Sequence, residues 1–228
     1  MTGYMRVDSP DRAGRPQRAD ARRNREALLV HAVELVAEHG PDVPLDLIAR
    51  SAGVGNATLY RHFPDRTALL HAIAVRVITA TAQAAAAALA EEPDSYAALA
   101  RYLGEALTVR VGWVMPAIAA ALPPDDAALS AARSRSLAAV TRLIANAQRD
   151  GAIRPDVTFG DLSLLLIRLA RPLPPGRDRA VQDAVAARHL AIVLAGLRAG
   201  DEPLPGAGLA LADLRSRRRH PGRASLTG

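Results

Sequence analysis

The chain has 228 residues, a formal net charge of +6 and no cysteine, and half of its residues are hydrophobic. The absence of cysteine excludes a disulfide framework, a thiol nucleophile and a thiolate metal site. No apolar run is long enough to span a bilayer and the N-terminal charges are scattered, so we expect no export signal, no membrane span and a cytoplasmic location. The positive charge favours a polyanionic partner if it is concentrated on one surface.

The N-terminal segment is the most basic part of the sequence. Residues 1–25 hold seven Arg against three Asp. Because residues 1–19 are rich in Arg, Pro and Gly and poor in apolar side chains, we expect a disordered basic arm. Such an arm could neutralise phosphates or enter a minor groove, or it could be a solvated extension. Arg22, Arg23 and Arg25 adjoin the first predicted helix, and we assign these three to contacts with a nucleic acid.

Three helices are predicted between residues 20 and 66. The first runs from about Asp20 to His39 and ends at Gly40. The second carries apolar residues at the i, i+3, i+4, i+7 spacing of a buried helical face across residues 45–52. Gly53 can end it in the left-handed conformation, and a third helix begins near Asn56. Two short helices joined by a glycine-containing corner form a helix-turn-helix, a fold that binds DNA.

The third helix is expected to bury Leu59 and Phe63 and to leave a mostly polar face exposed. Asn can bond to an adenine edge, Thr offers a methyl and a hydroxyl group, and Tyr, His and Arg can reach phosphates. These properties are those of a recognition helix. The candidate DNA-binding residues on it are Asn56, Ala57, Thr58, Tyr60, Arg61 and His62.

The sequence LDLIARSAGVGNATLYRHFPDRTALLHAI (residues 45–73), after NREALLVHAVELVAEHG (residues 24–40), resembles the DNA-binding domain of the TetR family of transcriptional regulators. The specific parts are the AGV corner, the T-L-Y-x-H-F helix and the following Asp65-Arg66. The resemblance implies DNA contacts by Thr58, Tyr60, His62 and Arg66, with Asn56 and Ala57 as the base readers. Gly55 and Asn56 stand where the family usually has Ser and Lys or a similar pair, so base preference cannot be carried over.

Residues 67–199 are expected to form a second, helical domain. A long helix capped by Asp65 runs to about Ala90 and would be about 35 Å long. Thr158 and Asp161 have the spacing of a capping box. Residues 200–228 are rich in Gly, Pro and Arg, which predicts a disordered basic tail, with a weak DNA contact as the alternative. The remaining helices are expected at Ser95–Gly112, from Pro116 to before Pro123, from Asp125 or Asp126 to Asp150, at Phe159–Ala170 and at Arg179–Ala199.

The last two predicted helices contain LSLLLIRLA and HLAIVLAGL, which are apolar on more than one face. One face can pack on the parent domain, and a second apolar face needs another cover. In the family that the sequence resembles, these helices pair with their copies in a four-helix interface, which implies a homodimer. The residues assigned to this interface are Leu162, Leu165, Leu166, Leu190, Val193 and Leu194.

The second domain also holds the candidates for an effector pocket. Aromatic residues make up only 3% of the chain, so a cavity would be lined mainly by Ala, Leu, Val and Ile and would suit an apolar or amphipathic ligand. Trp113, Met115 and Phe159 can equally be core residues. The bulky or charged candidates are Tyr102, Arg110, Trp113, Met115, Phe159 and Arg168.

The sequence contains no constellation for catalysis. Its six His lack the spacing of a metal site, and there is no GxSxG or Walker loop. We therefore expect no enzyme activity, cofactor or metal, and an all-α fold with a helix-turn-helix domain at 20–66 and a ligand-binding and dimerisation domain at 67–199. The resemblance implies a ligand-responsive regulator, most simply a repressor that binds a palindromic operator as a dimer. The alternative is a constitutive or architectural DNA-binding protein whose C-terminal domain only dimerises.

Overall fold

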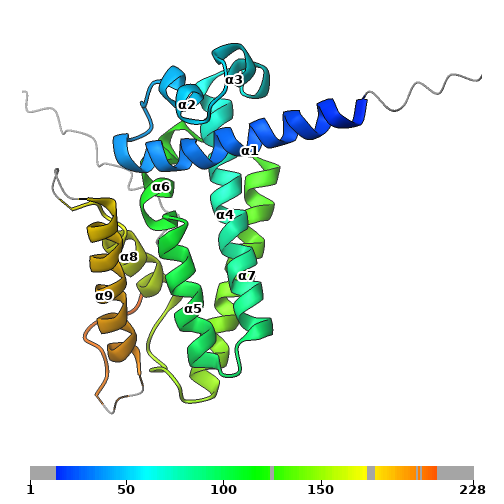
Figure 1. Ribbon diagram of the computed structural model, residues 1–228. Helices are drawn as coiled ribbons and strands as arrows, with labels where there is room; N and C mark the ends of the chain where they lie inside the picture. Colours follow the sequence, from blue (N-terminus) through cyan, green and yellow to red (C-terminus); the bar gives the residue numbers. More distant parts are fainter. Residues whose placement is uncertain (1–13, 124–125, 174–177, 199, 201, 210–228) are drawn as a thin grey trace, which may run out of the picture. The chain divides into compact units, whose positions relative to one another are not determined.

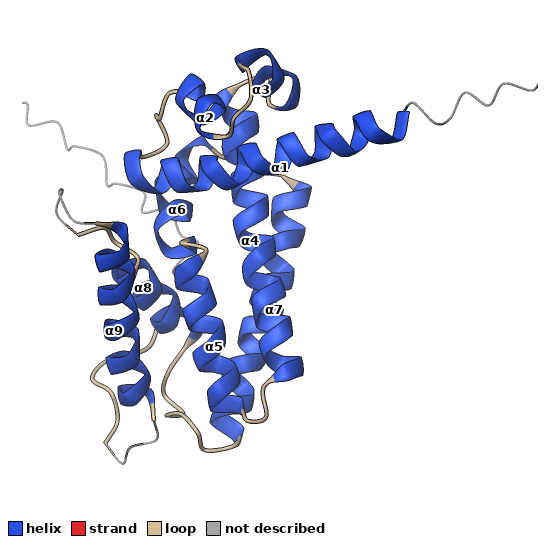
Figure 2. Ribbon diagram, in the orientation of Figure 1, coloured by secondary structure: helices blue, strands red, loops and turns tan. Residues whose placement is uncertain are grey.

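The computed structural model describes residues 14–123, 126–173, 178–198, 200 and 202–209 (Figure 1). Within these ranges the chain is helical and contains no strand (Figure 2), which confirms the predicted all-α class. The helices are α1 (Gly14–His39), α2 (Leu45–Ser51), α3 (Asn56–His62), α4 (Arg66–Glu91), α5 (Ser95–Thr108), α6 (Val111–Ile118), a short 3-10 helix (Ala119–Ala121), α7 (Ala127–Arg149), α8 (Phe159–Leu169) and α9 (Arg179–Leu197).

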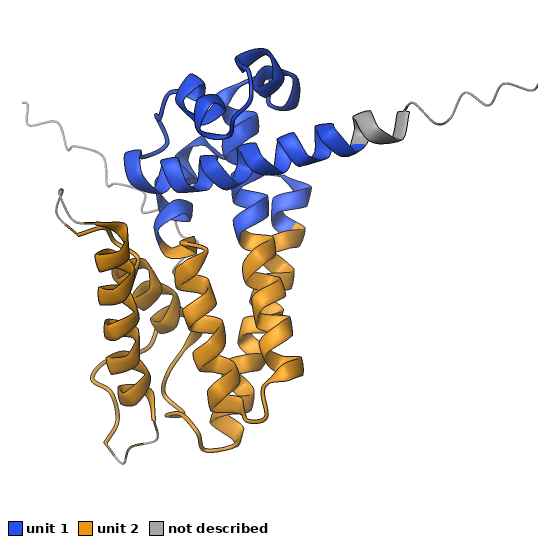
Figure 3. Cartoon of the chain, viewed as in Figure 1, with its two compact units in different colours: residues 1–77, 113–130 blue, residues 78–112, 131–228 orange. Residues whose placement is uncertain are grey.

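The chain divides into two compact units, coloured separately in Figure 3. Unit 1 comprises residues 1–77 and 113–130, and unit 2 comprises residues 78–112 and 131–228. The predicted domain boundary at residue 66 differs from this division, because the start of α4 and most of α6 belong to unit 1. Helices α4, α6 and α7 each contribute residues to both units.

The core of unit 1 is built from the apolar stripes that the sequence predicts. Leu28 and Val36 of α1, Ile48 of α2 and Leu59 of α3 are all completely buried. Phe63, directly after α3, is 1% exposed and fills the same core. Full burial of each such side chain contributes roughly 1.5–3 kcal/mol to folding, so this small unit depends on them.

The core of unit 2 is centred on α5. The buried face of α5 includes Leu99 and Leu103, and it packs against α8 and α9. Small residues of α4, Ala85 and Ala88, are completely buried in the same cluster. Ala85 and Ala88 therefore give α4 a share in the core of unit 2.

Several helix ends differ from the predicted ones. Helix α1 begins at Gly14 rather than Asp20, so the expected arm of residues 1–19 is helical from Gly14 onward, and residues 1–13 lie outside the described range. The cap of α5 is Asp94 rather than Ser95, because the Asp94 carboxylate accepts a hydrogen bond from the Ala97 amide at 2.7 Å. Helix α5 stops at Thr108 rather than Gly112, and α9 stops at Leu197 rather than Ala199.

Pro116 lies inside α6 rather than at the start of a helix as predicted. Proline lacks the N–H that would bond to the carbonyl of Gly112, and its ring crowds the preceding turn. In a helix of eight residues this removes one hydrogen bond close to the C-terminal end. The short α6 then continues into the 3-10 helix.

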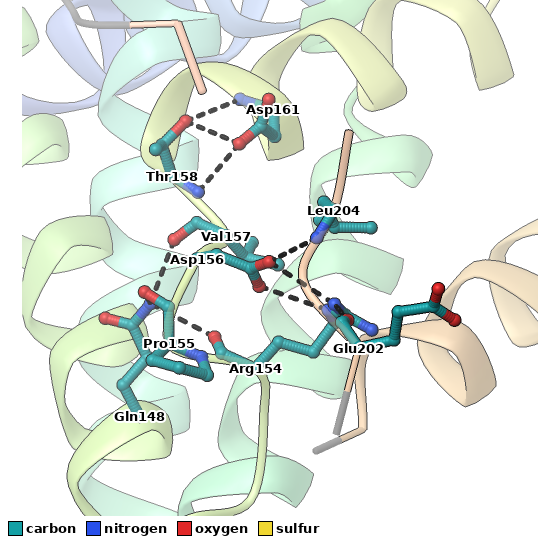
Figure 4. Close-up of polar contacts among 9 residues, drawn as sticks. All are labelled: Gln148, Arg154, Pro155, Asp156, Val157, Thr158, Asp161, Glu202 and Leu204. Carbon is teal, nitrogen blue, oxygen red and sulfur yellow. Dashed lines mark hydrogen bonds and ion pairs between the residues drawn. The ribbon is translucent and has the colours of Figure 1, made fainter. Parts of the chain in front are cut away.

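Residues 202–209 form a short strap over the start of α8, where the sequence predicts a disordered tail from residue 200. The Leu204 amide donates to Asp156 at 2.7 Å, and Arg154 bonds both to Asp156 and to the carbonyl of Glu202 (Figure 4). Thr158 also donates to the Leu209 carbonyl at 3.2 Å. We call residues 202–209 the C-terminal strap. The strap has a defined path along these hydrogen bonds although all its residues are exposed, and residues 210–228 lie outside the described range.

The polar groups around the strap also organise the loop before α8. Thr158 and Asp161 form the predicted capping box, with each side chain bonded to the main chain of the other residue (Figure 4). The side-chain amide of Gln148 donates to the main-chain carbonyls of three loop residues, and the shortest of these bonds is 2.9 Å, to Val157. These bonds give hydrogen-bond partners to main-chain groups at the end of α7 and the start of α8 that would otherwise have none within the helices.

The expectation that no segment could span a membrane is not supported on length and composition. Among the described residues, α4 and α9 are each long and apolar enough to do so, and α5 with residues 111–121 would count as a third, bent span. The most apolar stretch of α4 is 39% buried within the protein, and that of α9 is 11% buried. Helix α9 is therefore the apolar element with the least cover.

Candidate nucleic-acid interface and ligand cavity

The corner between α2 and α3 sets how the third helix is presented. Gly53 has a φ of +68°, which favours glycine, and the Val54 amide donates to the Ala49 carbonyl at 3.0 Å. Gly55 is the N-cap of α3, and its carbonyl accepts hydrogen bonds from the Thr58 and Leu59 amides. Because Leu59 is completely buried, the opposite face of α3 must point away from the core of unit 1.

The exposed face of α3 carries most of the residues assigned to DNA. Asn56 and Ala57 are exposed, and Tyr60 is 52% exposed although its ring is large and apolar. Arg61 is exposed and lies along the helix, where it donates to the Thr58 hydroxyl at 2.9 Å. Thr58 and His62 are half-buried at the sides of this face. The structure therefore brings these six residues together on one short helix.

His62 is the histidine of this surface. Burial lowers the pKa of its imidazole, and the positive charges of Arg25 and Arg61 lower it further. His62 shares a shallow hollow in unit 1 with Arg25, Asp65, His71 and other residues. The cationic neighbours make the neutral imidazole the favoured form when no anion is near.

Arg66, assigned to DNA from the family resemblance, also makes contacts within unit 1. Its Nη1 atom donates to the carbonyl oxygens of Pro41 and Val43, each at 2.7 Å. These two bonds fasten the first turn of α4 to the loop between α1 and α2. The part-buried guanidinium thus supports the helix-turn-helix, and its contact with DNA stays a prediction.

The three Arg assigned on α1 have separate surroundings. Arg23 forms an ion pair with Asp20, and both side chains are exposed. The guanidinium of Arg25 lies over the Phe63 ring, 5.1 Å from its centroid, which is a cation–π contact next to α3. Arg22 is exposed and has no ion-pair partner among the described residues. Arg25 is therefore the one of the three that the fold holds beside the exposed face of α3.

A cavity of about 530 Å³ lies within unit 2, between α5, α8 and α9. Of the six residues predicted for a pocket, Arg110 and Arg168 line it, and the other four do not. Tyr102 is in the core, where burial raises the pKa of its hydroxyl to about 12, and Phe159 packs against that core. Trp113 and Met115 belong to unit 1, where the Trp113 indole donates to the Ala37 carbonyl at 2.8 Å.

The sequence reasoning missed most of the cavity wall. It is formed by the end of α5 with Arg110, the end of α8 with the four residues that follow it, and α9. The missed residues with the clearest chemistry are Arg171, Arg179, Asp183 and His189. No local pattern marks them, because they meet only through the packing of helices that are far apart in the sequence.

The six residues assigned to a dimer interface differ in how far unit 2 already buries them. Leu162, Leu166 and Leu190 are at most 6% exposed and belong to the core of unit 2. Leu165, Val193 and Leu194 are partly buried against the same core. The apolar residue that α9 exposes most is Ile192, at 62%. Helices α8 and α9 thus turn these six residues toward the core of their own subunit, whereas Ile192 of α9 is exposed and available for another contact.

The chain is similar in sequence and structure to known transcriptional regulators. Residues 28–73 match the family "Bacterial regulatory proteins, tetR family", and residues 94–199 match the C-terminal domain of SbtR-like transcriptional regulators. A TetR transcriptional regulator from Streptomyces coelicolor is 32% identical, with 76% of this chain and 98% of that chain covered and a TM-score of 0.57. This chain belongs to the TetR family of transcriptional regulators. The sequence-based fold and family assignments are therefore confirmed.

Other TetR family members are similar over comparable lengths. A regulator from Mycobacterium vanbaalenii is 32% identical, with 81% of this chain and all of that chain covered and a TM-score of 0.54. The structure of LfrR from Mycobacterium smegmatis in complex with proflavine is 27% identical, with 75% and 95% covered and a TM-score of 0.54. In sequence alone, the transcriptional repressor LfrR of Mycolicibacterium smegmatis is 46% identical over 55 residues, which span 24% of this chain and only 29% of that repressor.

Proposed function

We propose that this TetR family regulator is a repressor that binds a palindromic operator as a homodimer and leaves it when a small organic molecule binds unit 2. The observation that carries the DNA-binding part is α3, which buries Leu59 and exposes Asn56 and Tyr60 on its other face. A short exposed helix after a glycine corner suits the major groove. The name of LfrR as a transcriptional repressor supports repression as the output.

The poor cover of α9 supports the homodimer. Its most apolar stretch is 11% buried, and Val181 and Ile192 are 44% and 62% exposed. An apolar helix this exposed needs a further contact. A second copy of the chain would supply one, and it would also fix the spacing of two α3 helices, so that neither half-site alone binds well.

The cavity in unit 2 supports an effector. Its volume of about 530 Å³ is within the range of ordinary ligand sites, about 300–1,000 Å³. Because LfrR was solved with proflavine, proflavine is the first compound to test against this chain. An effector releases the operator only if it prefers the conformation that binds DNA poorly, because equal affinity for both conformations shifts no equilibrium.

The experiment that tests the DNA-binding part is selection of bound fragments from the source genome, followed by fluorescence anisotropy with the selected operator. Tyr60→Ala should weaken binding to all sequences alike, whereas Asn56→Ala should change the preference among sequences. Unchanged affinity and unchanged salt dependence for Tyr60→Ala would show that α3 is not the reading helix.

The effector part has its own test, which separates it from a constitutive DNA-binding protein. An effector that lowers operator affinity by a given factor must itself bind operator-bound protein more weakly by the same factor, with a coupling of about 1–3 kcal/mol. Calorimetric titration of free and operator-bound protein measures both affinities. Equal affinities for every ligand that binds would favour the alternative in which unit 2 only dimerises.

A further inference from the structure

The lining of the unit 2 cavity combines apolar side chains with an excess of positively charged ones. Its described lining residues include aliphatic side chains and His189, but no Phe, Tyr or Trp. Around them stand four guanidinium groups and one carboxylate, Asp183. The aliphatic lining includes Leu107, Leu169, Leu173, Val185, Leu190 and Leu194, and the cationic lining consists of Arg110, Arg168, Arg171 and Arg179.

Arg110 is held at this wall by an unusual main chain. Its φ of +55° lies in the left-handed region, and it is the one non-glycine residue with positive φ among the described residues. The Arg110 amide donates to the Leu107 carbonyl at 2.9 Å. Two residues on, a Cβ at Gly112 would lie 2.5 Å from the Leu166 carbonyl oxygen, so α6 starts in close contact with α8. Strained conformations of this kind persist where the surroundings enforce them, often at ligand sites.

The single carboxylate does not balance the positive charge. Arg110 is only 15% exposed, and its Nη2 atom lies 3.4 Å from Asp183, which is long for a charged hydrogen bond. The same carboxylate lies 3.7 Å from Arg179 Nε. Arg168 and Arg171 have no ion-pair partner among the residues that the structure describes. A largely buried guanidinium beside aliphatic side chains is costly unless an anion faces it.

We propose that this cavity binds an aliphatic carboxylate, with the acid group against Arg110 and Arg168 and the hydrocarbon body along the leucine side chains of α5, α8 and α9. A planar guanidinium can donate two parallel hydrogen bonds to a carboxylate, which a neutral or cationic ligand cannot accept in the same way. The inference rests on the proposed function, because it names the chemical class of the effector. The site itself is tested on protein without DNA.

The experiment measures binding of decanoate to the full chain by isothermal titration calorimetry, below the concentration at which decanoate forms micelles. Decyltrimethylammonium, with the same chain and the opposite charge, is the control ligand. We expect decanoate to bind and the cation to bind at least tenfold more weakly. Arg110→Gln and Arg168→Gln should each weaken decanoate binding about tenfold, which is the loss expected for one charged hydrogen bond.

Two further variants make the result specific to charge at the wall. Arg188→Gln changes an exposed Arg of α9 that is not in the lining, and it should leave decanoate binding unchanged. Asp183→Asn removes the lining carboxylate and should tighten decanoate binding. Thermal unfolding of each variant shows whether it folds, and Arg168→Gln keeps the test informative if Arg110→Gln does not fold, because Arg168 is exposed.

Four results would overturn the proposal: no decanoate binding, equal binding of the two probes, unchanged decanoate binding in folded Arg168→Gln and Arg110→Gln, or weaker binding in Asp183→Asn. Operator release is measured separately by anisotropy. Charge-dependent decanoate binding without any change in operator affinity would support this site and contradict the effector role in the proposed function. Operator release by another compound, with no decanoate binding, would support the proposed function and overturn the carboxylate site.

Discussion

Arg66 provides a test of whether a family-typical DNA residue acts on DNA directly or through the fold. Arg66→Ala removes two hydrogen bonds from one charged group to the Pro41 and Val43 carbonyls. Charged hydrogen bonds contribute roughly 1.5–3 kcal/mol each, and partial exposure of this residue places the total near the lower end, about 3 kcal/mol. For a chain of this size that loss lowers the unfolding temperature by roughly 6–12 °C.

The assay for Arg66→Ala pairs thermal unfolding at fixed protein concentration with operator affinity measured at several salt concentrations. A positioning residue should lower stability and affinity but leave the slope of log affinity against log salt unchanged. A phosphate contact would lower that slope by about one. Arg61→Ala is the matched control, because Arg61 is exposed on α3 and should show the reverse pattern. An unchanged melting temperature with a reduced slope for Arg66→Ala would show a phosphate contact and contradict a positioning role.

Three other predictions concern assembly and packing. Ile192→Glu should place a charge in the dimer contact and give a folded monomer, and sedimentation showing an unchanged dimer would contradict this. Gly160→Ala should displace the strap, because the added Cβ would overlap the Leu209 carbonyl; hydrogen exchange at residues 202–209 should then rise, and unchanged protection would mean that the strap is not seated on Gly160. Tyr102→Phe should remove a loss of stability that the wild type suffers as pH rises from about 10 to 12, since burial raises the pKa of Tyr102 to about 12; identical alkaline unfolding curves would argue against its burial.

The parts of the fold that could be predicted are those encoded locally. The capping box of Thr158 and Asp161 and the glycine corner at Gly53 each depend on neighbouring residues, and the structure contains both. Leu59 and Phe63 were identified as buried from helical spacing alone. Such features can be predicted from the sequence because the contacts of caps, turns and helical faces are made by residues close together in the chain.

The parts that could not be predicted depend on contacts between distant segments. Nothing near Arg66 in sequence shows that its guanidinium reaches the loop before α2. The composition of the strap predicts disorder because it offers little apolar surface, yet Asp156 and Thr158 hold it through hydrogen bonds. Bulky aromatic residues were assigned to the pocket by size, whereas large rings stabilise a core most when they are buried, as Tyr102 is.

His62 gives the DNA-binding surface a pH dependence whose direction follows from its neighbours. Burial and the charges of Arg25 and Arg61 lower its pKa in the folded protein below the ordinary value of 6.5. The unfolded chain therefore binds more protons near that pH. The stability that His62 contributes is complete above about pH 6.5 and is lost as the pH falls below it. In the protein without DNA, protonation of His62 at low pH therefore lowers the free energy of unfolding.

Operator binding should reverse this preference. If His62 faces the DNA backbone, phosphates favour its protonated form, its pKa rises on binding, and the complex takes up a proton. Operator affinity should then increase as the pH falls from 7.5 to 6, provided that the protein remains folded, and His62→Gln should lose that increase. His39→Gln is the matched control, because His39 is exposed at the end of α1, away from α3 in sequence. Other titrating groups cancel in the difference between variants, so parallel pH profiles for wild type and His62→Gln would place His62 outside the interface.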